Sequence, residues 1–284
     1  MKSILRTILI ALVANLLLHV DSNCQSIDLG LGLGGSVYNG DLSHHSSFFA
    51  GEETNTSITA QIGITINRSW KFRAHYLRTK VEGSDEYATK PTLKMRNLHF
   101  WAPINEYAGN FEFHFFPTFE VSTKYISPYI SAGMGVFHFR PHASFNNQNY
   151  ELQPLRTEGQ GLPGNNISPY QLIETNYQLG LGFRLKLSQN FSLDFNSNLR
   201  RLTTDYLDDV SGVYYDINKL AIYKGEIAAK MAYRSDEVSN DLPESVAGLA
   251  RGNPNNNDSY IIHQVSITYS IPLRKKKAEI NSEL

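Results

Sequence analysis

Two groups of polar residues in this chain have side chains that could perform hydrolysis. His44-His45-Ser46 forms one group, and Asp205, Asp208 and Asp209 form the other. A His–Asp pair can activate water, and a Ser–His pair can act as a nucleophile. However, adjacent histidines have no spacing that commits both to one site, and aspartates of this kind commonly form turns. A hydrolase acting on lipid A or peptides is therefore an alternative reading of the sequence, and we expect a protein that is not an enzyme.

The usual motifs for metals and cofactors are missing from the sequence. No CxxC, HExxH, P-loop or dinucleotide fingerprint occurs. His114, His138 and His142 lack the spacing of metal ligands, so we expect neither a metal nor a cofactor. The net charge of −1 argues against nucleic acid as a partner.

The first 24 residues have the pattern of a signal peptide. Lys2 and Arg6 precede an apolar stretch, residues 8–18, and Ser22-Asn23-Cys24 offers small residues at a cleavage site before Gln25. The chain is therefore predicted to be exported, with residues 1–24 removed. Two alternatives remain: a lipoprotein acylated on Cys24, which lacks the usual aliphatic residue three places earlier, and a signal anchor, for which the apolar run is short.

Apolar and polar residues alternate strictly in eight segments of the mature chain. From Tyr177 to Leu187, for example, every second residue is apolar, and Arg184 and Lys186 lie among the residues between them. This period of two predicts β-strands, each close to the roughly 9–11 residues that a tilted membrane strand needs. The segments are residues 27–33, 58–66, 70–76, 109–115, 130–136, 177–187, 191–199 and 263–271.

The connections between these segments alternate between short and long. Residues 67–69, 117–126 and 188–190 are short connections, and residues 39–56, 81–105, 140–171 and 203–259 are long ones. An outer-membrane barrel has short periplasmic turns and long outer loops, whereas a sandwich has no reason to gather its long loops at one end. We therefore predict an all-β fold, an eight-stranded antiparallel transmembrane β-barrel over residues 25–273, integral to the outer membrane and in contact with its lipid.

In this topology the polar face of each strand looks into the barrel. An eight-stranded barrel is about wide enough to be filled by its own side chains, so we expect a plugged interior. A small channel is the alternative. The inward residues that would fill the interior are Arg73, Glu112, Arg184, Lys186, Asp194 and Arg200.

Three stretches test this prediction. Residues 220–235 are rich in helix formers, which favours a short helix in the last loop over a ninth strand. A ten-stranded barrel would need one more strand, within residues 94–100. Phe137 and Phe139 fall on the face opposite to Val136, which suggests a β-bulge.

Two long loops and the C-terminal tail carry the candidate binding residues. Residues 151–164 and 203–216 mix apolar residues with turn formers, a composition that lets a loop fold onto the barrel or onto a partner. The basic run of the tail, residues 274–284, would lie on the periplasmic side, as a solvated tail or as a docking patch. The loop candidates, for partner binding or loop closing, are Arg156, Thr157, Glu158, Gln160, Asp205, Tyr206, Asp208, Asp209 and Arg251. The docking candidates are Arg274, Lys275, Lys276 and Lys277.

Several of these stretches carry a family likeness. The sequence resembles the PorG-like outer-membrane barrels of the type IX secretion and gliding apparatus, over nearly the whole mature chain. The resemblance implies a non-enzymatic component of that machinery, associated with the periplasmic ring of the lipoprotein PorK and its partner PorN, and it supplies no catalytic residues. The matching pieces are YNGDL (38–42), RNLHF (96–100), LQPLRTEGQG (152–161), TDYLDDVSG (204–212) and RGNPNNNDSY (251–260).

Overall fold

The computed structural model describes residues 26–43, 53–67, 69–116, 125–240 and 242–273. The predicted signal peptide and its alternatives, the His44-His45-Ser46 group and the basic tail all lie outside the described residues.

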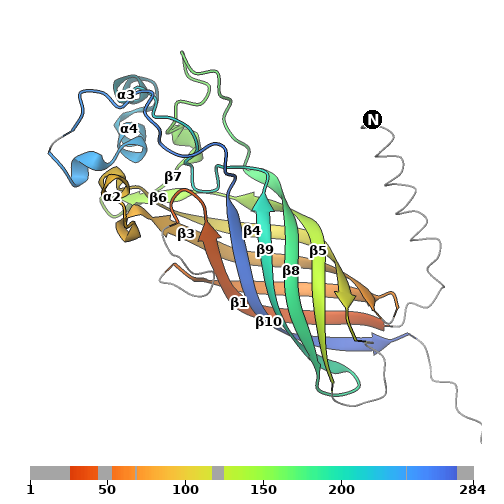
Figure 1. The fold of residues 1–284 in the computed structure, drawn as a ribbon. Coiled ribbons are helices and arrows are strands. Elements are labelled where there is room, and N and C mark those ends of the chain that lie inside the picture. Colours follow the sequence, from red (N-terminus) through yellow and green to blue (C-terminus); the bar gives the residue numbers. More distant parts are fainter. Residues whose placement is uncertain (1–25, 44–52, 68, 117–124, 241, 274–284) are drawn as a thin grey trace, which may run out of the picture.

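Eight antiparallel strands form a closed barrel, as the alternation predicted (Figure 1). Each strand pairs with its neighbour in the chain, β3 pairs with β4, and β1 pairs with β10 to join the two ends. The strands are β1 (Ser26–Asn39), β2 (Asn55–Thr65), β3 (Trp70–Ser84), β4 (His99–His114), β5 (Tyr125–Phe139), β8 (Ile173–Lys186), β9 (Phe191–Leu202) and β10 (Ser259–Pro272). The sheet's other two strands, β6 (His142–Phe145) and β7 (Gln148–Glu151), extend it beside β4 as a hairpin.

The barrel has two ends of different character. The turn end carries the short connections, and Ser26 pairs there with Pro272. The loop end carries the long connections and the helices α2 (Pro91–Arg96), α3 (Ile217–Lys224) and α4 (Glu226–Ala232) (Figure 1). It also carries the 3-10 turns η1 (Asp85–Tyr87), η2 (Gln153–Leu155) and η3 (Ser235–Glu237). No helix among the described residues is long and apolar enough to cross a membrane.

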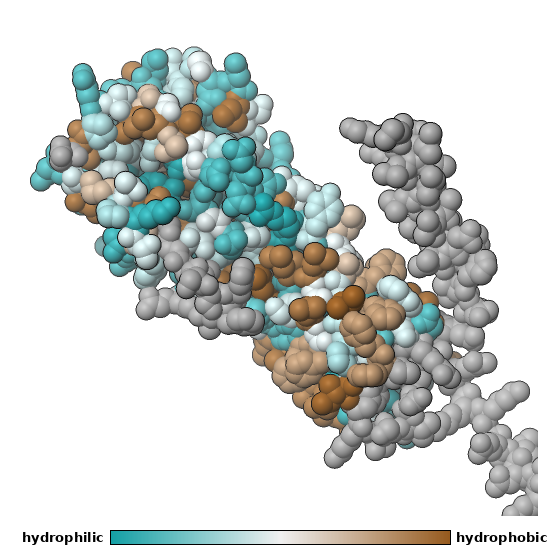
Figure 2. Space-filling model, in the orientation of Figure 1, coloured by the Kyte–Doolittle hydropathy of each residue, from teal (hydrophilic) through white to brown (hydrophobic). Residues whose placement is uncertain are grey.

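The turn-side half of the barrel is apolar outside and polar inside. Leu31, Leu179 and Leu181 face outward with 66%, 65% and 67% of their surfaces exposed, and hydrophobic residues gather over this part of the molecule (Figure 2). We call this outer surface the apolar belt. A barrel exterior of this kind suits hydrocarbon and not water.

Ion pairs fill the interior of the same half. Arg184 contacts Asp194 at 2.6 Å and Asp28 at 3.2 Å, and Asp28 also pairs with Lys71. Arg73 pairs with Glu112, in line with the prediction for inward charges. Lys186 differs, because it lies half-buried at the end of β8. Two interior cavities here measure only about 10 and 20 Å³, roughly the space of one water molecule each.

The loop-side half of the barrel is apolar inside. Leu77, Ile104, Phe137 and Phe139 are fully buried there in one hydrophobic core, while Arg78 on the outer face of β3 is exposed. Along a single strand the residues that point inward thus change from polar to apolar. An apolar interior beneath an exposed charge such as Arg78 suits an aqueous surrounding.

The predicted bulge at Phe137 and Phe139 is wrong. Residues of β5 pair one to one with β4 and with β8 through this region, including Phe137 with Glu106 and with Glu174. Both phenylalanines point inward like Gly135 before them. At this point the inward side chains change from polar to apolar, and their direction stays the same.

The strands are longer than predicted because they continue into the apolar-filled section. β3 and β4 have 15 and 16 residues, and they remain paired from Trp70 to Ser84. β4 begins at His99, so residues 94–100 contain the end of α2 and the start of β4 and no additional barrel strand. Strands that continue into a second, apolar-filled section exceed the length needed to cross hydrocarbon alone.

Helical structure in residues 220–235 is confirmed. Asp216 caps α3, where its side chain accepts a hydrogen bond from the Lys219 amide at 3.0 Å. Gly225, with a φ of 91°, separates α3 from α4. Such a positive φ favours glycine, which explains why the helical stretch breaks there.

The hairpin of β6 and β7 was not predicted. Its two-residue turn is Asn146-Asn147, with φ values of 50° and 60°. Two consecutive positive φ angles define the tight hairpin turn in which asparagine is favoured. The pair of asparagines in the sequence is the signal that could have revealed it.

Candidate functional site

The long loops close over the loop end of the barrel and form one packed unit, which we call the cap. It comprises the described residues 40–43, 85–98, 140–172 and 203–258. All five stretches that carry the family likeness contribute to it or to the strand ends directly beneath it.

Arg251 lies at the centre of the cap. Its guanidinium contacts Glu158 Oε1 at 3.1 Å and Asp209 Oδ2 at 3.6 Å, and it also donates to the backbone carbonyl of Asp209. Thr157 donates its hydroxyl to the same Asp209 carboxylate. These four side chains are all buried, so the loop after β5 and the loop after β9 are joined by charge at a site without water access.

Glu158 also holds the backbone of the last loop. Its carboxylate accepts hydrogen bonds from the amides of Ser211 and Gly212, at 2.9 and 3.1 Å, and from the hydroxyl of Tyr206 at 3.2 Å. A buried carboxylate with this many donors is well satisfied. Glu158 therefore fixes the course of residues 206–212.

A tyrosine hydroxyl joins two acids beneath this cluster. Tyr38 Oη lies 2.6 Å from Asp208 Oδ2 and 2.9 Å from Asp258 Oδ1. A phenol has one proton, so it can donate to only one carboxylate, and the second contact requires a carboxyl group that carries its own proton. Burial raises the pKa of both Asp208 and Asp258 well above the usual range, which agrees with this proton count.

Two further aspartates in the cap have raised pKa values. Burial raises the pKa of Asp205 to about 7, and the carboxyls of Asp41 and Glu158 act in the same direction. Burial raises the pKa of Asp209 to about 6, although Arg251 and two hydroxyl donors oppose this shift. The cap thus holds acids that take up protons near neutral pH.

The remaining loop candidates lie at the edge of this network. Gln160 is buried, and no hydrogen bond to its side-chain amide is found among the described residues. Arg156 is half-buried at the end of η2, in a left-handed conformation with a φ of 54°. The structure therefore brings Thr157, Glu158, Tyr206, Asp209 and Arg251 together, and it leaves Arg156 outside the central cluster.

Sequence reasoning missed several residues of the cap. Arg96 donates to both oxygens of Asp85 at 2.7 Å and to the carbonyls of Arg251 and Asp41 at 2.6 and 2.8 Å. Tyr170 donates to Asp209 at 2.7 Å. Arg96 and Tyr38 lie in the stretches RNLHF and YNGDL, so the family likeness contained a signal for both.

Two of the three aspartates proposed for hydrolysis, Asp208 and Asp209, are held inside the cap. Asp208 and Asp209 are 1% and 0% exposed, and both are engaged in hydrogen bonds within the cap. A general base must be within hydrogen-bond reach of a substrate proton. In this geometry the two carboxyls tie loops together, and the histidines proposed to work with them lie outside the described residues.

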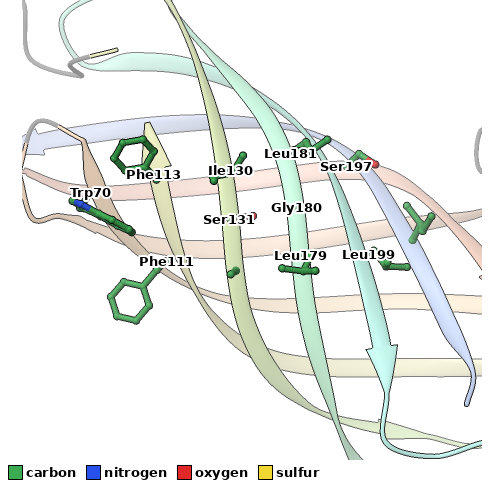
Figure 3. A pocket seen from close by; sticks show the side chains of 12 residues that line it. Trp70, Phe111, Phe113, Ile130, Ser131, Leu179, Gly180, Leu181, Ser197 and Leu199 are labelled. Carbon is green, nitrogen blue, oxygen red and sulfur yellow. The ribbon is translucent and has the colours of Figure 1, made fainter. Parts of the chain in front are cut away.

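Two larger hollows lie on the molecular surface. One, of about 730 Å³, opens on the cap between α2 and the last loop. The other, of about 530 Å³, runs over the outer faces of β4, β5, β8 and β9 within the apolar belt (Figure 3). Leu179 and Leu181 of β8 and Phe111 of β4 are among the side chains that line the second one.

The fold and the sealed interior define the class of this protein: an eight-stranded barrel of the outer-membrane type. The chain belongs to the family described as Domain of unknown function (DUF6089), whose model matches residues 6–158, more than half of its length. No curated protein matches the sequence.

Solved structures of small outer-membrane barrels show distant likenesses. Neisserial surface protein A (NspA) shares 9% identity, with a TM-score of 0.42, over 86% of this chain and 97% of its own. Ail, the attachment invasion locus protein of Yersinia pestis, shares 10% identity, with a TM-score of 0.39, over 87% and 99%. The outer membrane enzyme PagL shares 14% identity, with a TM-score of 0.29, over 87% and 99%. At these values the likenesses carry no argument about function, and the assignment of the fold rests on the strand pairing.

Proposed function

We propose that this protein is a non-enzymatic outer-membrane component of the type IX protein secretion machinery, which also serves gliding motility. In this role it binds the periplasmic ring formed by a lipoprotein and its partner and holds that ring at the membrane. The observation that carries the proposal is a barrel with a lipid-compatible exterior whose interior and loop end are both closed.

The apolar belt supports a place in the membrane. It surrounds the turn-side half, where the interior carries the paired charges, and acyl chains are the natural filling of the hollow seen in Figure 3. Short turns at one end and a folded cap at the other agree with a periplasmic and an extracellular side. The cap then faces the cell exterior.

The packed interior supports a scaffold in preference to a channel. The lumen holds ion pairs such as Arg184–Asp194, and the cavities described within it are about the size of single water molecules. Small solutes need a continuous polar path, which this filling does not offer. Planar-bilayer recording should accordingly give no conductance from correctly folded protein, and regular conductance steps would favour the channel.

The family likeness supplies the secretion role and its partner. The ring lies in the periplasm, so its contact surface belongs to the turn end. Ser26 and Pro272 pair at that end, so Leu273, the last described residue before the tail, follows there. The basic run of the tail, Arg274 to Lys277, is the part of the chain best suited to an acidic partner.

Deletion and recovery experiments test the proposal. Loss of the gene should abolish export of substrates that bear the type IX C-terminal signal, and pull-down of the tagged protein should recover the ring lipoprotein. Normal export after the deletion, together with a pull-down that recovers no ring lipoprotein, would reject the proposal. A changed lipid A mass profile on deletion would favour a hydrolase instead.

A matched pair of triple variants tests the docking site. Changing Lys275, Lys276 and Lys277 to Gln should reduce recovery of the ring lipoprotein. Changing Lys90, Lys94 and Lys219 of the cap to Gln removes the same charge at the opposite end and should leave recovery unchanged. Equal recovery with both variants would show that the tail does not bind the ring.

A further inference from the structure

A row of hydrogen-bond donors crosses three strands on the outside of the barrel, at the cap-side edge of the apolar belt. Arg78 of β3 pairs with Asn105 of β4, and Asn105 pairs with His138 of β5. Neighbouring strands lie about 4.8 Å apart, so these three side chains stand side by side. Arg140, exposed just beyond the end of β5, is the next residue on the same side as His138. We call these four residues the basic row.

The donors of the basic row have no acceptor within the part of the protein that the structure describes. Arg78 and Arg140 are exposed, and no hydrogen bond or ion pair of either guanidinium is found there. Tyr76 donates its hydroxyl to Asn105 Oδ1 at 2.7 Å, which leaves the two N–H groups of the same amide as donors. The row therefore offers guanidinium, amide and imidazole N–H groups to an acceptor from outside the chain.

Positive charge is in excess on this surface. On the outer faces of β3, β4 and β5 and at the end of β5, the acidic and basic residues are Arg78, Lys80, Glu82 and Arg140. Lys80 and Glu82 pair at 2.7 Å and cancel each other, so two guanidiniums remain. Arginine binds phosphate oxygens with two parallel hydrogen bonds, so the surface is complementary to a phosphate group.

Acids on the strands behind and beside the row are already engaged. Glu106, on the inner face of β4, is held by Arg200 at 3.2 Å and is fully buried. Glu174 of β8 accepts a hydrogen bond from the Thr203 hydroxyl at 3.1 Å. Neither carboxylate forms an ion pair with the guanidiniums of the row.

The row lies where the hydrocarbon of a membrane is expected to end. Arg78 is eight residues beyond Trp70, the first residue of β3. This separation is about 27 Å along the strand, or roughly 20 Å along the barrel axis at a tilt of about 40°. The apolar band of such barrels is about 25 Å tall and is edged by aromatic residues. Tyr76 and Tyr107, with ring centroids 5.1 Å apart, lie at this edge next to the row.

We propose that the basic row binds the phosphate group of a membrane lipid. The phosphate accepts hydrogen bonds from Arg78, Asn105 and Arg140, and the acyl chains lie on the apolar belt. A lipid is the source of the phosphate because its own chains hold the head group at this height. The inference rests on the membrane placement proposed above and is independent of the secretion role.

Lipid binding to the purified full-length protein in detergent micelles tests the inference. The probes are dioleoylphosphatidic acid and dioleoylglycerol, which share both acyl chains and differ in the phosphate. By native mass spectrometry the first phosphatidic acid should bind about ten-fold more tightly than the diacylglycerol. Equal affinities, in protein that keeps its heat-dependent mobility on gels, would overturn the proposal.

Matched double variants assign the preference to the row. Arg78→Gln with Arg140→Gln should reduce it to less than about two-fold. Arg201→Gln with Lys219→Gln removes the same charge from exposed positions on β9 and α3 and should retain it. All four residues are exposed, so both variants should fold. A preference that survives the first pair, or that both pairs remove equally, contradicts the site.

The amide of Asn105 distinguishes a directed site from general attraction by charge. Asn105→Leu keeps both guanidiniums and removes the amide donors, and it should weaken phosphatidic acid by about three-fold. An unchanged affinity would show that charge alone attracts the lipid and that the row is not a site.

Inorganic phosphate distinguishes a lipid site from a site for a free anion. It carries the same acceptor oxygens without acyl chains. In large excess it should leave phosphatidic acid bound, because contacts of the chains with the apolar belt contribute to the affinity. Displacement of the lipid would overturn its assignment as the ligand.

Insertion into lipid vesicles tests the membrane placement separately. Protein that inserts and folds but shows no phosphate preference rejects the basic row alone. Protein that fails to insert rejects the placement, and the inference fails with it.

Discussion

The lumen and the cap of this barrel bury charge in two different ways. In the lumen each acid meets a base, as in Lys71–Asp28, Arg73–Glu112 and Arg184–Asp194. In the cap the acids exceed the bases, and protons and hydroxyl groups such as that of Tyr38 make up the difference. The lesson is that the buried charges of the lumen are balanced by side chains of opposite charge, whereas those of the cap are balanced in part by protonation.

The largest expected effect comes from removing the positive charge at the centre of the cap. Arg251→Ala leaves Glu158 and Asp209 buried without their cation, which costs about 3–5 kcal/mol for a buried pair. Hydrogen exchange should show loss of protection in residues 206–212, while the barrel keeps its heat-dependent mobility on gels.

The control for this variant is Arg201→Ala, which removes an exposed guanidinium that bonds Asn256 at 3.0 Å. It should change the protection of the cap little. If residues 206–212 stay equally protected in Arg251→Ala, the cap is held by its apolar contacts and not by this cluster.

The next largest effect should come from placing a charge on the outer surface of the barrel. Leu181→Arg in the apolar belt places a cation in hydrocarbon and should lower the free energy of folding into lipid vesicles by about 2–4 kcal/mol. Val213→Arg, at an exposed apolar position of the cap, should change it by less than about 0.5 kcal/mol. Similar losses from both variants would mean that the belt does not face lipid.

A pair of tyrosine variants compares the two networks directly. Tyr38→Phe removes the hydroxyl shared by Asp208 and Asp258 and should destabilise the cap by about 1–3 kcal/mol. Tyr260→Phe removes a 2.6 Å hydrogen bond to Glu106, which keeps Arg200, and should cost about 1 kcal/mol. Urea titrations of both variants in vesicles would give these values. A larger loss from Tyr260→Phe would show that the lumen depends more on its hydroxyl groups than the cap does.

The strands could be predicted from sequence because their signal is local. The alternation from Tyr177 to Leu187 is visible over a few residues, and the lengths of the connections then give the topology. The alternation was misleading where the barrel interior changes from polar to apolar. Phe137 and Phe139 point inward there, but their apolar character suggested that they lie on the outer face. Alternation reports which residues share a face, and it does not report what that face contacts.

The cap could be predicted only in part. Its most specific stretches were recognised as candidates, yet their contacts join residues that are far apart in the chain: Glu158 and Arg251 are 93 positions apart, and Tyr38 and Asp208 are 170 apart. No local period encodes such pairs. Composition also gave no sign that the aspartates would be buried, because the same residues are common in solvated turns.

The last contrast between the two regions that we predict is a dependence of cap stability on pH. Burial raises the pKa of Asp209 to about 6 and that of Asp205 to about 7, against about 3.9 for an unfolded aspartate. The folded cap therefore favours the protonated acids: their contribution to stability is full below about pH 4 and is lost as the pH rises through about 6 to 7. Hydrogen exchange of residues 203–211, corrected for intrinsic rates, should show protection that falls over this range. Asp205→Asn should flatten the upper part of the profile, since an amide does not titrate there. A profile that stays flat from pH 4 to pH 8 in the unmodified protein would mean that the cap acids are as well paired as those of the lumen, and the contrast between the two regions would fail.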